Sequence, residues 1–296
     1  MLVLRFLAGL GSTMFTISAQ ALIVKVAPPR IRGRASSTYA TAFLLGNIIG
    51  PVVGAGLSFL GMRWPFVIYG AAVAAAAVVV WVRLPKHDRD VDLAARPPMR
   101  LDEAFGHPSY RALLASAFAN GWVNMGVRVA VLPLFAASVF PHGAAEAGLA
   151  LAAFALGNAV TLQFSGKLAD DIGRKPLILT GLTVTALSTA VMGFATSFWP
   201  LIAISVIAGV GGGLLVPSQQ ASLADIIGND RSGGKTMSVF QMCMDAGQVI
   251  GPILIGAAAG EFGFPAAFGI CGAIAVLAQV VWAVVGKETH PEKADQ

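Results

Sequence analysis

Three ionisable side chains, Arg5, Arg128 and Asp245, lie inside long apolar segments of the chain. A charge in such a segment is costly, so it usually faces a water-filled cavity or an opposite charge. Asp245 is the only carboxylate near the middle of an apolar segment, and a carboxylate that is removed from water is protonated more easily. Asp245 could therefore take up and release a proton. An arginine beside it would oppose protonation, and the pair could act as a switch.

Polar side chains recur at helical spacing around these charges. Asn120, Asn124 and Arg128 are four residues apart, so they share one face of a helix. Two further stripes contain Arg5, Ser12, Thr16 and Gln20, and Ser238, Gln241, Asp245 and Gln248. Such stripes would be unstable against lipid. They either line an aqueous cavity or form a hydrogen-bonded network between helices, and the spacing leaves both interpretations open.

The composition is that of a membrane protein. Of the 296 residues, 56% are hydrophobic and 12% are charged, and the mean hydropathy is +0.75. A soluble domain carries about 25% charged residues. Nine apolar segments approach or exceed the ~20 residues that cross a bilayer core as a helix. They span residues 2–26, 37–60, 64–84, 109–138, 146–166, 177–196, 199–224, 235–259 and 264–286. We therefore expect an all-α membrane protein, a helical bundle of about nine transmembrane helices.

The basic residues indicate how these helices are oriented. Seventeen of the 20 Lys and Arg residues lie in the odd-numbered loops, at their edges or in the C-terminal tail, and Arg63 is the only one in an even-numbered loop. The positive-inside rule places the odd-numbered loops and the C-terminus in the cytoplasm and the N-terminus outside. Short basic loops without interleaved aromatic residues are not typical of a nucleic-acid-binding face. The abundance of Ala, Gly and Val suits a bacterial inner membrane.

Residue types that carry catalytic chemistry are not gathered anywhere in the sequence. The four histidines lie in or next to loops and form no ligand cluster, and Cys243 and Cys271 lie in apolar segments without metal-ligand spacing. The glycines of residues 209–213 lie inside an apolar helix with no preceding strand, which argues against a dinucleotide site. No nucleophile–base pair or phosphate loop is apparent. We therefore expect neither an enzyme nor a metal or organic cofactor.

An internal repeat relates the two ends of the chain. The pattern G-x-x-x-G-P at residues 46–51 recurs at residues 247–252, and the pattern A-G-x-G at residues 8–11 recurs at residues 208–211. This repeat pairs the first three helices with the last three and leaves the helices of residues 109–196 without partners. We expect those partners to precede the first residue, in a complete protein of about twelve helices and ~400 residues.

The repeat also predicts how the chain is divided. A cleaved signal peptide is a second explanation for the odd number of helices, because residues 18–21 resemble a cleavage site, but the basic cluster follows the apolar segment instead of preceding it. The expected parts are residues 1–84, the remainder of an N-terminal half; 85–108, a cytoplasmic loop; 109–286, a complete C-terminal six-helix half; and 287–296, a cytoplasmic tail.

Three motifs carry a resemblance to a known family. Residues 166–176 read G-K-L-A-D-D-I-G-R-K-P, residues 46–55 read G-N-I-I-G-P-V-V-G-A, and residues 5–11 read R-F-L-A-G-L-G. They are similar to the loop motif, the antiporter motif and the helix-four motif of the major facilitator superfamily, and within it of the twelve-helix proton-coupled drug exporters. The resemblance covers nearly the whole chain, as the family's helices four to twelve. Asp171 stands where the loop motif usually has Arg, and Ala55 replaces the last Gly of the antiporter motif.

The resemblance implies a secondary transporter that exports small molecules by alternating access, as two halves rock about a central site. It implies the proton gradient as driving force, a monomer, and the lipid bilayer, a small-molecule substrate and protons as partners. The implied substrate and proton pathway contains Arg5, Gln20, Asn120, Asn124, Arg128, Gln241, Asp245 and Gln248. The implied antiporter-like motif contains Gly46, Gly50, Pro51 and Gly54, and the implied gating motif contains Gly166, Asp170, Gly173, Arg174 and Lys175.

By the same resemblance, Asp170 is expected to dock against the start of a helix near Ser36 and Ser37. The helix dipole favours an anion there, and the contact would brace one conformation. The glycines of residues 46–55 have a second interpretation, because glycines four residues apart also let helices pack closely. Two other functions stay open, namely a solute uptake symporter on the same scaffold and a truncated membrane fragment that transports nothing.

Overall fold

The computed structural model describes residues 8–16, 18–19, 22, 31, 34–43, 45–46, 64–83, 97–228 and 231–290. The chain divides into two compact units, one of Met1–Thr41 with Pro98–Gln296 and the other of Ala42–Pro97. Regular structure in these described ranges is helical, apart from an isolated bridge between Pro98 and Ser232. The described part of the chain is therefore all-α, as the sequence predicts.

The smaller unit contains α3, which runs from Trp64 to Arg83. Its 20 residues coincide with the apolar segment expected at 64–84. A helix of this length is about 30 Å long, which matches the hydrocarbon thickness of a bilayer. Its charge-free interior favours the helix because an apolar segment in lipid must satisfy its own backbone groups.

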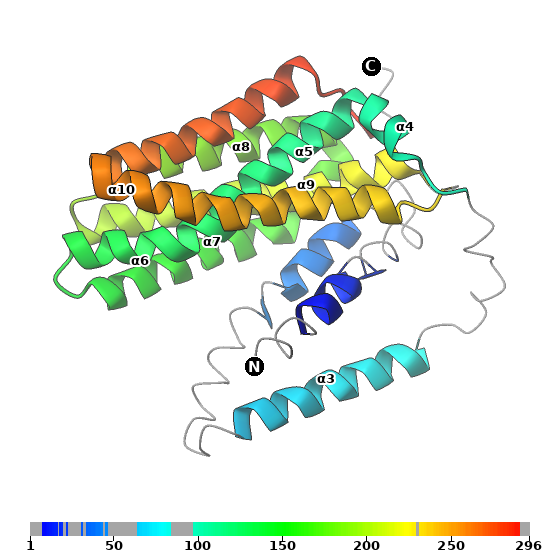
Figure 1. The fold of residues 1–296 in the computed structure, drawn as a ribbon, viewed down its shortest axis with the longest axis horizontal. Coiled ribbons are helices and arrows are strands. Elements are labelled where there is room, and N and C mark those ends of the chain that lie inside the picture. Colours follow the sequence, from blue (N-terminus) through cyan, green and yellow to red (C-terminus); the bar gives the residue numbers. More distant parts are fainter. Residues whose placement is uncertain are drawn as a thin grey trace. The chain divides into compact units, whose positions relative to one another are not determined.

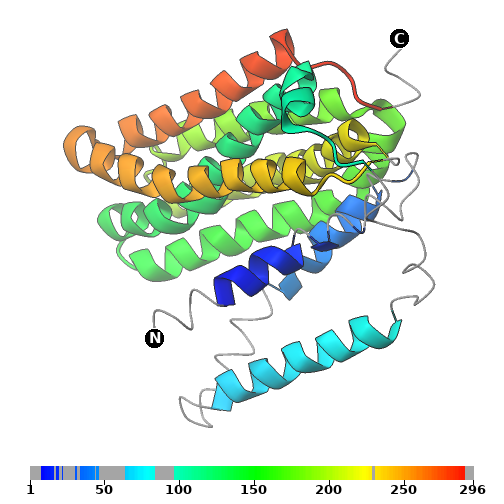
Figure 2. The ribbon, with the colours of Figure 1, turned by 45° about the vertical axis from the view of Figure 1, so that its right-hand side comes forward.

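The larger unit is a bundle of long helices (Figures 1 and 2). Its elements are α4 (Leu101–Gly106), α5 (Pro108–Asn120), η4 (Gly121–Val127), α6 (Arg128–Val139), α7 (Gly143–Ile172), α8 (Arg174–Met192), α9 (Phe198–Ile227) and α10 (Gly234–Val284). α5, η4 and α6 form one continuous span of 32 residues. α9 packs along α7 and α8, and α10 packs along α8 and α5. Buried residues between these helices form two apolar clusters, one toward each end of the bundle.

α10 consists of two helices that are joined at Gly263. An unbroken helix of 51 residues would be about 77 Å long, more than twice the thickness of a bilayer core. Gly263 has φ 79° and ψ 166°, and Pro265 follows two residues later. A positive φ favours glycine, and proline cannot complete the hydrogen bonds of a helix interior. The two parts of α10 therefore correspond to the segments predicted at 235–259 and 264–286.

The loop expected between residues 166 and 177 is a single residue. α7 continues through Ile172, α8 begins at Arg174, and Gly173 between them has φ 118° and ψ 167°. The sequence prediction ended the first helix too early because charged residues interrupt its apolar pattern from Lys167 onward. Hydropathy follows the apolar core of a bilayer, whereas the helix extends beyond it.

α10 approaches α5 and η4 closely because glycines line the contact. A Cβ atom at Gly247 would overlap the carbonyl oxygen of Phe118, and one at Gly121 would overlap the carbonyl oxygen of Met244. Small residues allow this kind of backbone contact between helices in a membrane. The copy of the G-x-x-x-G-P pattern in α10 is therefore a packing seam. The copy at residues 46–51 lies mostly outside the described residues.

This seam makes a testable prediction about stability. We expect Gly247→Ala to lower the Tm of the purified protein by roughly 4–8 °C, because overpacking of about 2 kcal/mol has nowhere to relax against a backbone carbonyl. Gly256→Ala is the matched control, since Gly256 lies on the same helix and a Cβ atom added there would meet no neighbouring helix or side chain within 4 Å. Equal Tm values for the two variants would contradict the proposed seam.

Candidate functional site

The predicted pathway and motif residues are only partly described. Those outside the described residues are Arg5, Gln20, Gly50, Pro51 and Gly54. Gly46 is helical and belongs to the smaller unit, and the other predicted residues all lie in the larger unit. Among the residues that the structure describes, no three His, Cys, Asp or Glu side chains are grouped so that they could hold a metal ion.

Asn120, Asn124 and Arg128 lie inside the bundle. They are 2%, 3% and 2% exposed. Asn124 Nδ2 donates a hydrogen bond to Asn120 Oδ1 at 3.0 Å, and Asn120 Nδ2 lies 3.8 Å from Met244 Sδ on α10. The stripe coincides with the π-helical turn of η4, and such turns are frequent at functional sites. These contacts lie within one span and toward α10, and they leave both interpretations of the stripe open.

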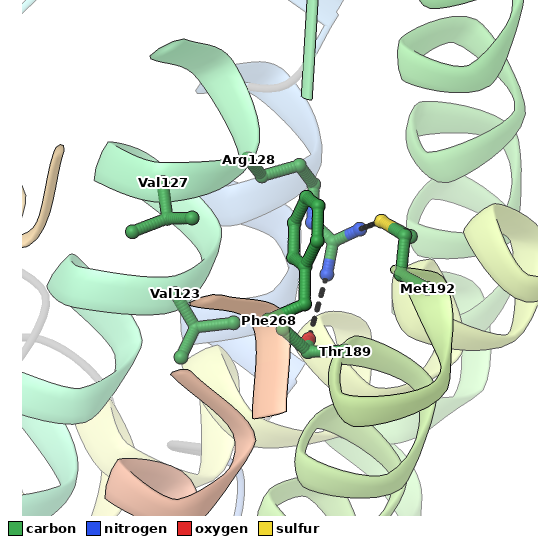
Figure 3. Close-up of a pocket in the computed structure, with 6 residues that line it drawn as sticks. All are labelled: Val123, Val127, Arg128, Thr189, Met192 and Phe268. Carbon is green, nitrogen blue, oxygen red and sulfur yellow. Dashed lines mark hydrogen bonds between the residues drawn. The ribbon is translucent and has the colours of Figure 1, made fainter. Parts of the chain in front are cut away.

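Arg128 extends from the start of α6 toward α8 (Figure 3). Its Nη2 donates a hydrogen bond to Thr189 Oγ1 at 3.3 Å, its Nη1 lies 3.9 Å from Met192 Sδ, and its guanidinium stacks 4.5 Å from the centre of the Phe154 ring. The hollow beside the guanidinium is lined by Val123, Val127, Thr189, Met192 and Phe268 and is too small to hold a water molecule. Binding sites for drug-sized molecules are about 300 Å³ or larger. Arg128 is therefore packed within the bundle in this structure.

Asp245, unlike Asn120, Asn124 and Arg128, is exposed on the outer side of its helix. Asp245 and Gln248 are exposed on α10, and Gln241 is half-buried and donates a hydrogen bond from Nε2 to Asp245 Oδ1 at 2.8 Å. No ion pair joins Asp245 to Arg128 in the described part of the chain. The arginine switch is therefore not formed with Arg128 in this structure. The exchange of a proton at Asp245 stays a prediction.

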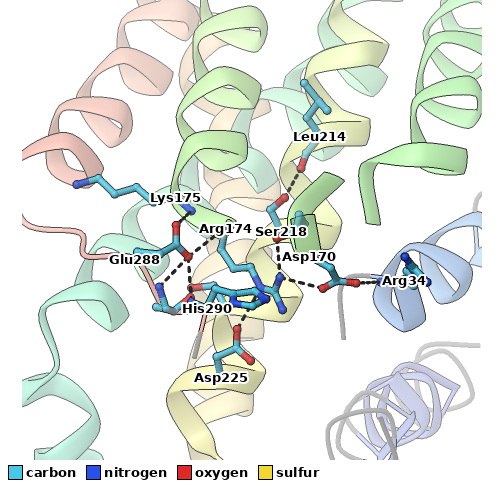
Figure 4. Close-up of polar contacts among 12 residues, drawn as sticks. Arg34, Asp170, Arg174, Lys175, Leu214, Ser218, Asp225, Glu288 and His290 are labelled. Carbon is cyan, nitrogen blue, oxygen red and sulfur yellow. Dashed lines mark hydrogen bonds and ion pairs between the residues drawn. The ribbon is translucent and has the colours of Figure 1, made fainter. Parts of the chain in front are cut away.

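The motif of residues 166–176 forms a buried ion-pair cluster at the ends of α7, α8 and α9 (Figure 4). The fully buried Arg174 places Nη1 2.8 Å from Asp170 Oδ1 and Nε 3.1 Å from Asp225 Oδ2. The same Nη1 donates a hydrogen bond to the carbonyl oxygen of Ala169 at 2.6 Å. Removing one partner of a buried ion pair costs about 3–5 kcal/mol. The motif therefore ties three helices together, and Gly166 lies buried in α7 within it.

Asp170 also contacts the helical stretch of residues 34–43. The backbone N–H of Arg34 donates a hydrogen bond to Asp170 Oδ2 at 3.1 Å, and the Ser37 hydroxyl donates to a backbone carbonyl of α7. A carboxylate at the N-terminus of a helix is stabilised by the helix dipole. The contact expected near Ser36 and Ser37 is thus present, and its role in gating stays a prediction.

Sequence analysis missed Glu288, which completes this site from the C-terminal segment. Its carboxylate accepts hydrogen bonds from the backbone N–H groups of Arg174 at 2.9 Å and Lys175 at 3.0 Å. It also accepts bonds from the backbone N–H groups of Thr289 and His290, both at 2.9 Å. Glu288 therefore caps α8, whose own N-cap, Gly173, has no side chain to do so.

A glycine at the start of a helix is the one sequence signal that points to this arrangement. A Cβ atom at Gly173 would lie 2.6 Å from Glu288 Oε2, so the glycine both adopts the positive φ and leaves room for the carboxylate. Lys175 adds a hydrogen bond from Nζ to the carbonyl oxygen of Gly286 at 2.6 Å. The missing cap is visible in the sequence, but no local pattern indicates which distant carboxylate replaces it.

The hydrogen bonds change the acidity of Glu288, which lies beyond the last residue of α10. Burial raises the pKa of its carboxyl, but the backbone N–H groups of His290, Arg174, Lys175 and Thr289 lower it by more, so that the pKa lies below its ordinary value. A carboxylate with a lowered pKa stabilises the folded protein above its ordinary pKa. That stabilisation is lost as the pH falls through the lowered pKa.

We therefore expect Glu288→Gln to lower the Tm at pH 7 and to flatten the decrease of Tm in acid. The amide keeps the size of the side chain but lacks the charge that favours the start of α8. The measurement is the Tm of each purified protein between pH 7 and pH 3.5. Glu261→Gln, at an exposed carboxylate of α10, is the control. If the Tm of Glu288→Gln decreases in acid as steeply as that of the control, Glu288 does not stabilise the fold in this way.

Similar proteins place this fold and motif in a family. The sequence model of the Major Facilitator Superfamily matches residues 1–143 and 113–296, which together include the whole chain. A multi-drug resistance efflux pump PmrA homolog from Lactococcus lactis subsp. lactis is 26% identical over 297 residues, which are 98% of this chain and 72% of that protein. Multidrug resistance protein 2 of Bacillus subtilis is 31% identical over 177 residues, which are 60% of this chain and 43% of that protein.

Two solved structures share the fold. The human organic anion transporter MFSD10 (TETRAN) has a TM-score of 0.69 at 16% identity, over 88% of this chain and 66% of that chain. A double Trp mutant of XylE has a TM-score of 0.69 at 16% identity, over 94% of this chain and 68% of that chain. This chain therefore spans about two thirds of each. The family match over the full chain, the helical bundle and the charged motif agree, and the chain belongs to the Major Facilitator Superfamily of membrane transporters, which are not enzymes.

Proposed function

We propose that the chain takes part in the proton-coupled export of small amphiphilic molecules by alternating access. The observation that carries the proposal is Asp245, a carboxylate on an open face of α10 that is not paired with Arg128. A carboxylate in this position can exchange a proton between two sides of a membrane as its surroundings change. The relatives named as multidrug efflux pumps support the direction and the class of substrate.

The neighbours of Asp245 suit this role. Gln241 donates a hydrogen bond to the carboxylate, and Gln248 is exposed one turn further along the same face of α10. Both neighbours are neutral amides, which can hydrogen-bond the Asp245 side chain without forming an ion pair with it.

Replacement of the carboxylate tests the proton step. We expect Asp245→Asn to abolish the accumulation of ethidium driven by a proton gradient in inverted membrane vesicles, because the amide cannot carry the proton. The Tm of the purified variant is expected to stay within about 2 °C of the wild type, since Asp245 is exposed. Glu261→Gln is the control, with an exposed carboxylate near the end of the same helical segment.

The same experiment separates the alternatives. An exporter accumulates ethidium in inverted vesicles, whereas an uptake symporter on the same scaffold accumulates its solute in right-side-out vesicles. Unchanged transport by Asp245→Asn would contradict the proton step. An absence of gradient-driven transport by the wild-type chain would contradict the proposal as a whole for this chain.

The contact between Asp170 and the helical stretch of residues 34–43 is proposed to brace one state of the transporter. In that state the end of the bundle that carries Asp170 and Arg174 is closed. Asp170 is well suited because its two oxygens have different partners, Arg174 on one side and the backbone N–H of Arg34 on the other. Opening at this end would break the second hydrogen bond and leave the first in place. The loop motif would thereby favour closure without locking it.

We expect Asp170→Asn to speed the labelling of a cysteine at position 36, introduced as Ser36→Cys in a chain without Cys243 and Cys271. Ser36 is 5% exposed in this structure, so a membrane-impermeant maleimide reaches it only when the stretch separates. A several-fold higher rate in inverted vesicles is the expected result, with Asp171→Asn as the control. A rate equal to that of the control would contradict the brace.

A further inference from the structure

The stretch of residues 98–106, which we call the strap, precedes α5 and is fastened to the turn between α9 and α10. Pro98 and Ser232 form a parallel bridge, and the backbone N–H of Met99 donates a hydrogen bond to the carbonyl oxygen of Ser232 at 3.0 Å. Pro97 and Pro98 have no backbone N–H, so Met99 supplies the first donor of the strap. The strap includes α4, which lies beside the turn in Figure 1.

An ion pair adds a second contact between the strap and the turn. Glu103 of α4 pairs through Oε1 with Nη1 of Arg231, which lies next to the bridged Ser232. Asp102 is the neighbouring carboxylate on α4, and it pairs with Arg100 inside the strap at 2.9 Å. Two adjacent carboxylates therefore have different partners, one across the contact and one within the strap.

Apolar side chains hold the strap against the bundle. Met99 is 5% exposed and belongs to the same buried cluster as Ile227 at the end of α9 and Met237 at the start of α10. Ala104 of α4 is fully buried in this cluster. Burial of apolar side chains contributes more to such a contact than an exposed ion pair does. The strap is therefore packed on the bundle, and the ion pair lies at the edge of that packing.

Tyr110, in the first turns of α5, connects the strap with the start of α10. Its ring meets the ring of Phe105 edge to face, with the centres 5.6 Å apart. Its hydroxyl donates a hydrogen bond to the carbonyl oxygen of Thr236, in the first turn of α10, at 2.9 Å. Tyr110 and Thr236 are both fully buried. The strap and the first turn of α10 therefore pack on one shared side chain.

We propose that the strap clamps the α9–α10 turn and holds the start of α10 in place. The chain that connects α3 with the bundle is then fastened at Pro98, so a pull on it acts on the turn before α10 and not on α5. α10 carries Asp245, so the strap links the connecting chain to the helix that bears this carboxylate. The inference goes beyond the proposed export, because the clamp requires neither a substrate nor the exchange of a proton.

Cysteine labelling of the purified full chain in detergent tests the clamp. Met99→Cys is introduced in a chain without Cys243 and Cys271, and the reaction with a water-soluble maleimide is followed over time. Position 99 is buried while the strap is fastened, so it reacts only when the strap lifts. Glu103→Arg replaces an attraction to Arg231 by a repulsion, and we expect it to raise the labelling rate about three- to tenfold.

Matched variants connect this rate to the ion pair. Asp102→Arg makes the same change of charge one residue away, and its rate is expected to stay within about twofold of the parent chain. The combination of Glu103→Arg with Arg231→Glu reverses the pair and is expected to restore the slow rate. If Glu103→Arg does not fold, Glu103→Gln is compared with Asp102→Asn, and an increase of about two- to fivefold is expected for the first alone. Equal rates for Glu103 and Asp102 variants, or no restoration by the reversed pair, would overturn the clamp.

The effect on α10 has a readout of its own. Cys243 is half-buried on α10, two turns after Thr236 on the same face. In a chain that keeps Cys243 as its only cysteine, Glu103→Arg is expected to raise the labelling rate of Cys243, whereas Asp102→Arg leaves it unchanged. If Glu103→Arg speeds labelling at position 99 but not at Cys243, the strap does not hold the start of α10 and the proposal is overturned.

Discussion

A buried guanidinium is costly unless it is paired, and the pairing of Arg174 organises the end of the bundle where α7, α8 and α9 meet. Arg174 is paired with Asp170 from α7 and Asp225 from α9, and the start of α8 is held by Glu288 from the C-terminal segment. A buried ion pair is stable only while it is complete, so these four parts of the chain behave as one unit. The contact of Asp170 with Arg34 is additional to that pairing. The helical stretch of residues 34–43 can therefore separate without exposing an unpaired charge.

Close backbone contact decides which face of α10 remains open. Gly247 lies against Phe118, and a residue two positions away on a helix points about 200° around its axis. Asp245 therefore faces away from α5, while Gln241 and Gln248 share its side. The glycine seam and the open polar stripe are thus two consequences of one orientation of α10. A side chain larger than hydrogen at the seam would change the packing of α10 and also the surface on which Asp245 lies.

The sequence predicts those features that depend on local pattern. Each apolar segment between residues 109 and 286 corresponds to a helix, because a segment in lipid has to be helical, although α7 continues six residues beyond its predicted end. The contact of Asp170 with residues 34–43 is predicted through a recognised motif. The sequence does not predict Glu288 as the cap of α8, because that contact joins positions more than a hundred residues apart. Nor does it predict the depth of Arg128, since spacing shows that residues share a face but not what that face packs against.

The two buried arginines show why the position of acidic residues matters more than their number. Arg174 is the first residue of α8, where the carboxylates of Asp170 and Asp225 reach it from the ends of α7 and α9. Arg128 lies among apolar side chains and Thr189, where a carboxylate of the protein would need its own desolvation to be compensated. The Arg128 guanidinium is instead met by a hydroxyl, a thioether sulfur and an aromatic ring.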